Sequence, residues 1–175
     1  VRSLQAALKS MGYDPGALDG LDGPKTRAAA AAFGGGAGVA KADTAAPAHK
    51  LDARSETSLR GVHPDLVRIV RRAAEISPVK FTVIEGLRTK ARQADLVKAG
   101  ASKTMNSRHI TGHAVDMVPH RPDGALAFDW PLYHILAPAV KQAANELAVP
   151  LVWGGDWASF RDGPHFELDR KKYPA

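Results

Sequence analysis

His109, His113 and Asp116 lie within eight residues of one another, and each is a residue type that binds metal ions. Imidazole and carboxylate groups are ligands that zinc takes in proteins. On a helix, the four-residue spacing of the two histidines would place both on one face, as in the His-Glu-x-x-His zinc motif. Gly112 interrupts the segment, however, and residues 114–118 alternate in the manner of a strand. We therefore expect Asp116 to project from a strand and His109 to reach it from the preceding loop.

A second pair of metal-binding residue types, Asp162 and His165, follows later on a short turn. A catalytic zinc site needs three protein ligands and an open position for water. The two segments can supply these ligands as His109, Asp116 and His165, with Asp162 as the general base that accepts a proton from the water. Asp156 is the alternative base, although a carboxylate after two glycines could instead bind backbone amides of its turn. The short spacing to His165 favours Asp162.

Two less specific interpretations concern the first segment. His109 and Asp116 could form a buried hydrogen-bonded pair without any metal, because an ionisable residue in an apolar strand needs a partner. His113 could be a fourth ligand or a substrate contact. We expect it instead to support a ligand or the local structure, because a fourth protein ligand would close the site to water.

Arg88 lies where a short β-branched strand, 81–84, is expected to meet a helix that ends near Ala99. Such junctions commonly carry functional side chains. A guanidinium held there could stabilise an oxyanion or bind a substrate carboxylate. Glu85 and Gln93, on either side of Arg88 in the sequence, could position it or contact the substrate.

Four short motifs occur in order between about residues 55 and 168. They are Glu85-Gly86-Leu87-Arg88-Thr89 with Arg92-Gln93, Ser107-x-His109-x-x-Gly112-x-Ala114-x-Asp116, Trp153-Gly154-Gly155-Asp156-Trp157, and Asp162-x-x-His165. The second and fourth resemble the two signatures of the zinc D-alanyl-D-alanine carboxypeptidase and L-alanyl-D-glutamate endopeptidase family, which includes many phage endolysins. The first matches that family's upstream block, and the third resembles a segment of the endolysin branch. One motif alone would be weak, whereas four in the family's order are specific.

The resemblance implies a Zn²⁺ site made by His109, Asp116 and His165. It also implies that Asp162 is the general base, that Arg88 binds the oxyanion or a substrate carboxylate, and that Ser107 binds substrate or orients a ligand. The implied substrate is the peptidoglycan stem peptide, cut at the L-alanyl-D-glutamate bond or at its D-alanine end.

We expect the L-alanyl-D-glutamate bond to be the target of an endolysin or cell-wall hydrolase. Such an enzyme acts on the wall in the periplasm or outside the cell, and is made in a host cytoplasm or carried by a virion. A D-alanyl-D-alanine carboxypeptidase of wall remodelling and a non-catalytic peptidoglycan-binding protein are the alternatives.

Residues 1–33 have the spacing of a small helical module. Their pattern of Leu4-Gln5-x-x-Leu8, Gly12-Tyr13, Asp19-Gly20 and Gly23-Pro24-Lys25-Thr26 resembles the three-helix peptidoglycan-binding domain found beside cell-wall hydrolases. Against that pattern we expect the first helix to have lost its start, so the alternative is a vestigial helical hairpin that helps only solubility or spacing. Residues 34–53 are rich in Gly, Ala, Lys and Pro and are expected to be a flexible linker, followed by the catalytic domain at 54–175.

The pattern of elements in the second domain predicts an α+β fold. Helices are expected from about Pro64, from Thr89 to about Ala99 and from Trp130 to about Leu147, with strands at 81–84, 114–118, 150–153 and 166–168. We expect a small antiparallel sheet with Asp116 and His165 at its centre and helices covering the opposite face.

The composition limits other functions. The net charge is +6, but no run of Arg and Lys is interleaved with aromatic residues, so nucleic acid is not an expected partner. No apolar run approaches the ~18 residues that span a bilayer. Cysteine is absent, which excludes disulfides and thiolate chemistry. We expect a monomer, and because the chain begins with Val1 we expect its start to have been trimmed or processed.

Overall fold

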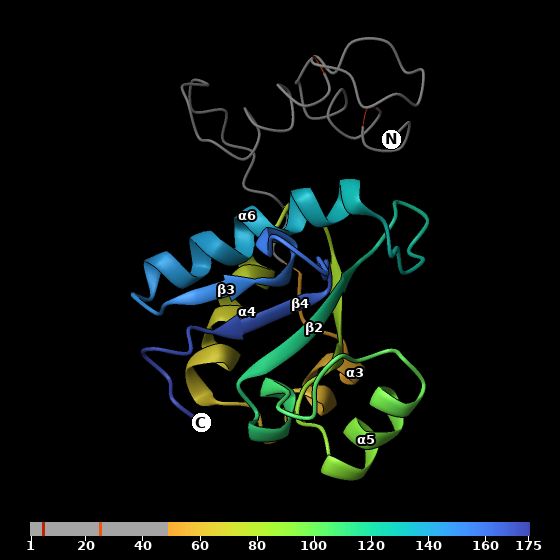
Figure 1. Ribbon diagram of the computed structural model, residues 1–175. Coiled ribbons are helices and arrows are strands. Elements are labelled where there is room, and N and C mark those ends of the chain that lie inside the picture. Colours follow the sequence, from red (N-terminus) through yellow and green to blue (C-terminus); the bar gives the residue numbers. More distant parts are fainter. Residues whose placement is uncertain (1–4, 6–24, 26–48) are drawn as a thin grey trace.

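The computed structural model describes residues 5, 25 and 49–175 (Figure 1). The expected N-terminal module, 1–33, and the expected linker up to residue 48 therefore lie outside the described residues, apart from two helical positions, Gln5 and Lys25. The chain already contacts the second domain at His49, whose backbone N–H donates to the Ala74 carbonyl at 3.1 Å. In the part of the chain that the structure describes, no helix combines the length and apolar character needed to cross a membrane.

Four strands form one antiparallel sheet in the order β1 (Phe81–Glu85), β2 (Ala114–Pro119), β4 (His165–Leu168) and β3 (Leu151–Trp153). The two central strands carry candidate metal ligands, and Asp116 on β2 lies directly opposite His165 on β4. The expected α+β fold is thus confirmed, with these two residues at the centre of the sheet.

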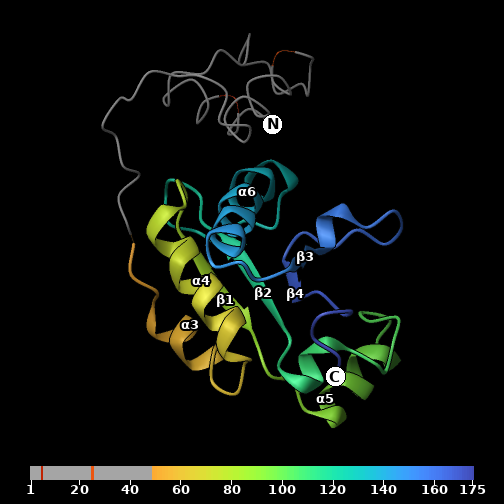
Figure 2. The ribbon, with the colours of Figure 1, turned by 90° about the vertical axis from the view of Figure 1, so that its left-hand side faces the viewer.

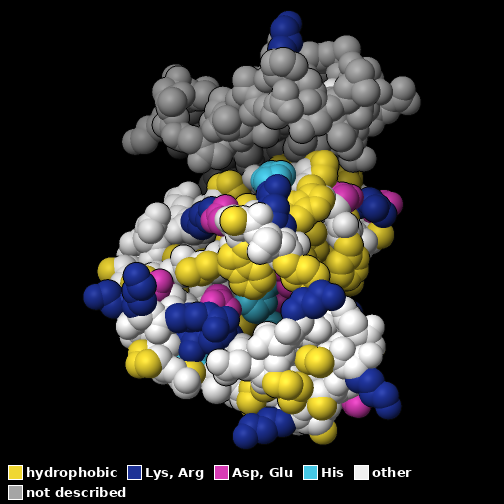
Figure 3. Space-filling view, viewed as in Figure 1, with side chains coloured by type: hydrophobic (Ala, Val, Ile, Leu, Met, Phe, Trp, Pro, Cys, Tyr) yellow, Lys and Arg dark blue, Asp and Glu magenta, His cyan; other side chains and the backbone are white. Residues whose placement is uncertain are grey.

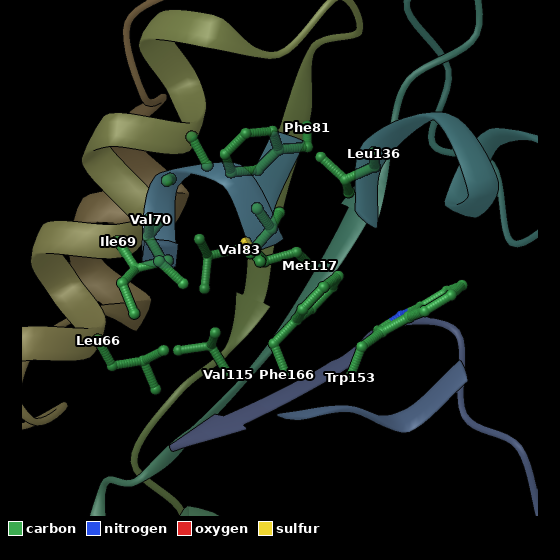
Figure 4. Close-up of a cluster of buried hydrophobic side chains, with 14 of the residues drawn as sticks. Leu66, Ile69, Val70, Phe81, Val83, Val115, Met117, Leu136, Trp153 and Phe166 are labelled. Carbon is green, nitrogen blue, oxygen red and sulfur yellow. The ribbon is translucent and has the colours of Figure 1, made fainter. Parts of the chain in front are cut away.

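Helices α4 (Pro64–Ile76) and α6 (Trp130–Glu146) cover one face of the sheet, and α3 (Ala53–Ser58) packs against β1 (Figures 1 and 2). The apolar face of α4 is buried in the core that they share, together with strand residues on the same side of the sheet (Figure 4). The core includes Leu66, Ile69, Val70, Val83, Val115, Met117 and Phe166. Burying one such side chain stabilises the fold by about 1.5–3 kcal/mol. Because neighbouring strand residues point to opposite faces, Asp116 is directed away from this core.

The opposite face of the sheet is flanked by shorter elements. These are α5 (Lys90–Lys98), the 3-10 helix η1 (Arg108–Thr111) and the 3-10 helix η2 (Gly154–Asp156). Thr89 caps α5 as expected, because its Oγ1 accepts from Arg92 N–H at 3.2 Å. The loop that follows α5 and the loop that follows η2 project from the side of the sheet away from α4 (Figure 2).

Gly112 makes the turn between η1 and β2. Its φ is +71°, a left-handed conformation that favours glycine. A Cβ atom at this position would also collide with the carbonyl oxygen of Gly61. Glycine is therefore needed here for two reasons, and the turn fixes where His109 lies relative to Asp116.

Candidate active site

Two imidazole nitrogens and one carboxylate oxygen meet on the open face of the sheet. His109 Nε2 and His165 Nδ1 each lie 3.3 Å from Asp116 Oδ1, and they lie 3.3 Å from each other. Among the described residues, this is the only group of three or more His, Cys, Asp or Glu side chains that could hold a metal ion. The structure thus brings together the three expected ligands, although the two histidines are 56 residues apart in the sequence.

Hydrogen bonds behind the two rings orient their nitrogens. His109 Nδ1 lies 2.8 Å from the carbonyl oxygen of Gly86, which can only accept a hydrogen bond. The ring proton is therefore on Nδ1, and the Nε2 lone pair faces Asp116. His165 Nε2 lies 3.0 Å from Glu167 Oε2, so its proton is held there and the Nδ1 lone pair faces the same point. Such partners fix the ring orientation and strengthen a histidine as a metal ligand.

The spacing of the three atoms can be compared with a zinc site. Ligands at about 2.0–2.1 Å from a tetrahedral zinc ion lie about 3.3–3.4 Å from one another. The three observed separations of 3.3 Å match this edge length. Two nitrogens and one carboxylate oxygen are also a donor set that a catalytic zinc ion accepts. The residues present therefore fit a zinc ion with one open position.

The charges of the site also favour a bound cation. Burial alone would raise the pKa of Asp116, but His109 and His165, which donate hydrogen bonds to it when their rings are protonated, hold that pKa well below its usual value. Burial alone would lower the pKa of His165, whereas its bonds with Asp116 and Glu167 raise it to about 9. Positive charge is thus stabilised among these groups, and a divalent cation can supply it in place of a proton.

Arg88 lies beside the ligands with its guanidinium held on several sides. Its Nε and Nη2 donate to the two carboxylate oxygens of Glu85 at 2.9 and 2.6 Å, and Nη1 donates to Gln93 Oε1 at 2.7 Å. Nη2 also lies 3.5 Å from Asp116 Oδ2. Glu85 and Gln93 therefore position Arg88, which was one of the two roles considered for them, and the cation is directed at the carboxylate ligand.

Asp162 and Asp156 lie in different environments. Asp162 lines the same pocket as the three ligands. A Cβ atom at Gly154 would be 3.1 Å from the Cβ atoms of both Asp162 and His165, so the glycine lets each of these two residues lie close to position 154. Burial and the neighbouring charge of Asp116 raise the pKa of Asp162. Asp156 is exposed and forms an ion pair of 2.6 Å with Lys141.

Of the other two candidate residues, Ser107 lies at the pocket and His113 lies outside it. Ser107 lines the pocket and caps η1, since its Oγ accepts from His109 N–H at 3.4 Å. This contact links Ser107 to the orientation of a ligand. His113 is not among the residues that line the pocket. Its Nδ1 lies 2.9 Å from Thr111 Oγ1 and its ring contacts His63 at 5.1 Å, so it belongs to the neighbouring turn.

Sequence reasoning gave no role to Glu167, which is 3% exposed and supports His165. Arg170 in turn holds Glu167 through two hydrogen bonds of 2.7 and 3.1 Å. A signal was present in the sequence, because residues two apart on a strand share a face and Glu167 follows His165 by two. The Gly86 carbonyl that binds His109 could not be predicted in this way, because a backbone group is not marked by a residue type.

The three candidate ligands, Arg88 and Asp162 line one pocket of about 320 Å³. Trp157 contributes to its wall, with its ring 5.1 Å from that of His165. On this face of the molecule, histidine side chains lie deep in a hollow with acidic and basic side chains around it (Figure 3). The arrangement combines a metal-binding group, a carboxylate with a raised pKa and a fixed cation in one place, which is the equipment of a hydrolase.

Comparison with known proteins places this site in a family. Residues 48–173 match the family described as phage L-alanyl-D-glutamate peptidase, and residues 1–34 match a putative peptidoglycan binding domain. The L-alanyl-D-glutamate peptidase of Escherichia phage T5 is 35% identical over 127 residues, which cover 71% of this chain and 92% of that protein. The enzyme of the same name from Listeria phage A118 is 35% identical over 100 residues, which cover 57% of this chain but only 34% of that protein.

A solved structure is similar over the same region. The crystal structure of the Serratia marcescens L-Ala D-Glu endopeptidase ChiX matches with a TM-score of 0.69 and 51% sequence identity, over 73% of this chain and 96% of that one. The resemblance inferred from four short motifs is therefore confirmed over the whole second domain. This chain belongs to the phage L-alanyl-D-glutamate peptidase family.

Proposed function

We propose that this protein is a zinc peptidase that hydrolyses the L-alanyl-D-glutamate bond of peptidoglycan stem peptides. The observation that carries the proposal is the triangle of His109 Nε2, Asp116 Oδ1 and His165 Nδ1, with its zinc-like separations of 3.3 Å. Membership of the family and the names of its relatives support the choice of bond.

His109, Asp116 and His165 would hold the zinc ion, which when bound would lower the pKa of a water molecule toward ~7 and polarise the scissile carbonyl. Asp162 is the general base in this proposal. It takes a proton from the attacking water and delivers it to the amine that leaves. The burial that raises its pKa makes Asp162 a stronger base, so it can take the proton from water and hold it until the amine leaves.

Arg88 stabilises negative charge in the same proposal. Its contacts with Glu85 and Gln93 fix the guanidinium before substrate arrives, so no reorganisation is needed during the reaction. Its position 3.5 Å from Asp116 also balances the charge of that ligand. Ser107 orients His109 through the cap of η1.

The N-terminal residues support a site of action at the cell wall. Residues 1–34 match a putative peptidoglycan binding domain, so we propose that they hold the enzyme on its polymeric substrate. The protein would then act as an endolysin or other wall hydrolase, as a monomer, where the wall is accessible.

Purified peptidoglycan provides the test. The protein is incubated with it, and the soluble fragments are analysed by mass spectrometry after labelling of new amino termini. We expect new D-glutamyl amino termini, their loss after treatment with EDTA, and their return when zinc is added. Release of free D-alanine instead would assign a carboxypeptidase, and activity indifferent to EDTA would rule out the metal mechanism.

A further inference from the structure

Four cationic side chains line the pocket, and three of them are already engaged. They are Arg88, Lys103, Arg108 and Arg170. Arg88 is bound by Glu85 and Gln93, and Arg170 is bound by Glu167. Arg108 is buried; its Nη2 donates to the carbonyl oxygens of Leu168 at 3.4 Å and Tyr173 at 2.7 Å. None of these three is free to turn toward a ligand without leaving a buried partner unpaired.

Lys103 differs from the other three cations. It is exposed, and no carboxylate or hydrogen-bond acceptor contacts its amino group among residues 5, 25 and 49–175. Its Nζ lies 5.5 Å from the centre of the Phe160 ring, within the range of a cation–π interaction. Phe160 lines the same pocket, so the contact links the loop after α5 to the loop after η2.

The Phe160 ring is held in an unusual place. The backbone φ of Phe160 is +52°, which a residue with a Cβ atom rarely adopts, and the residue is 59% exposed. The two residues that follow Phe160 are bound to η2. Arg161 Nε donates to the Gly155 carbonyl at 2.7 Å, and Asp162 N–H donates to the Gly154 carbonyl at 3.0 Å. An exposed aromatic ring in a strained conformation at a pocket rim is more readily explained by function than by packing.

The proposed substrate carries a free carboxylate, which a cation without another partner can bind. A glutamyl residue that is linked to its neighbour through one carboxyl group keeps the other as a carboxylate at neutral pH. The pocket is also lined by four acidic residues, Glu85, Asp116, Asp162 and Glu167, which would repel that group. We propose that Lys103 binds the free carboxylate of the glutamyl residue that follows the scissile bond, and that Phe160 positions Lys103. This inference rests on the proposed function of the site.

Two synthetic stem peptides test the assignment. Both contain the L-alanyl-D-glutamyl bond, and they differ only in whether the free carboxyl group is a carboxylate or a carboxamide. We expect the zinc-loaded wild-type protein to prefer the carboxylate by about tenfold in kcat/KM, as one charge-assisted contact allows. Lys103→Met keeps the aliphatic part of the side chain and should hydrolyse the two peptides at similar rates, with the loss mainly in KM. Lys103→Glu should prefer the carboxamide.

Matched controls keep the outcomes distinct. Lys98 is an exposed lysine on α5 that does not line the pocket, so Lys98→Met should retain both the rate and the preference. Zinc content measured on every variant reports whether the site is intact. A Lys103→Met protein with wild-type zinc and the wild-type preference would overturn the assignment. If the wild-type protein cleaves neither peptide, the proposed function itself fails, and this inference fails with it.

Discussion

Replacing Asp162 by asparagine should stop turnover and leave the metal site in place. The change keeps the shape of the side chain but removes its negative charge and its ability to take a proton. The backbone N–H of residue 162 bonds to the Gly154 carbonyl at 3.0 Å, and asparagine keeps that contact. Asp162 is not one of the three atoms in the ligand triangle. We therefore expect the variant to fold and to bind zinc with the same stoichiometry.

The expected loss follows from the role of the group. A positioned general base contributes about 10²–10⁴-fold to rate, or roughly 3–5 kcal/mol of transition-state stabilisation. Asp156→Asn is the matched control. Asp156 is exposed and its ion pair with Lys141 is of a kind worth about 0.2–1 kcal/mol, so the control should lose little activity or stability. Initial rates on a stem peptide and zinc content by atomic absorption are measured on both proteins.

Two results would refute the reasoning. If Asp156→Asn loses turnover while Asp162→Asn keeps it, the base is Asp156, although Asp162 lines the same pocket as the three ligands. If Asp162→Asn loses zinc together with activity, Asp162 takes part in binding the metal and the three-ligand site is incomplete.

Other predictions concern the metal, its support and the turn that leads to it. Removal of the metal with EDTA should abolish peptide hydrolysis, and zinc should restore it in an activity assay. Glu167→Gln removes the charge that holds the His165 ring, so zinc affinity in a competition titration should fall by about 10–100-fold, whereas Glu146→Gln on the exposed surface should not change it. Gly112→Ala places a Cβ atom against the Gly61 carbonyl at a φ of +71°, and should lower the free energy of unfolding by at least about 1–3 kcal/mol in urea titrations.

The sequence predicted the elements of the second domain because their local signals agree. The alternation of residues 114–118 and the β-branched run at 81–84 correspond to β2 and β1. Pro64 begins α4, with His63 Nδ1 accepting from Asp65 N–H at 3.2 Å. Each signal lies within a few residues, so it can be seen without knowing what packs against the segment.

What the sequence could not show were contacts between distant segments. The antiparallel register that places Asp116 opposite His165 depends on pairing across 49 residues. The sequence indicated that these two residues act together only through its resemblance to a known family. The environment of Arg88 was equally hidden. The sequence left open whether Glu85 and Gln93 contact substrate or Arg88, and only the fold shows that both hold the guanidinium.

The two histidines offer different ring nitrogens because their elements approach the site differently. His165 lies on a strand, where the next residue on the same face is Glu167, so its Nε2 meets a carboxylate from its own strand and Nδ1 is left for the metal. His109 lies on the 3-10 turn η1, where its Nδ1 lies 2.8 Å from the Gly86 carbonyl oxygen just after β1, so Nδ1 is used there and Nε2 is left for the metal. A lone pair from each ring then reaches the same point from two directions, with Asp116 on the strand between them. The positions of the donors are thus set by the pairing of β2 with β4 and by the capped η1 turn, whose own hydrogen bonds hold the backbone that carries the three ligands.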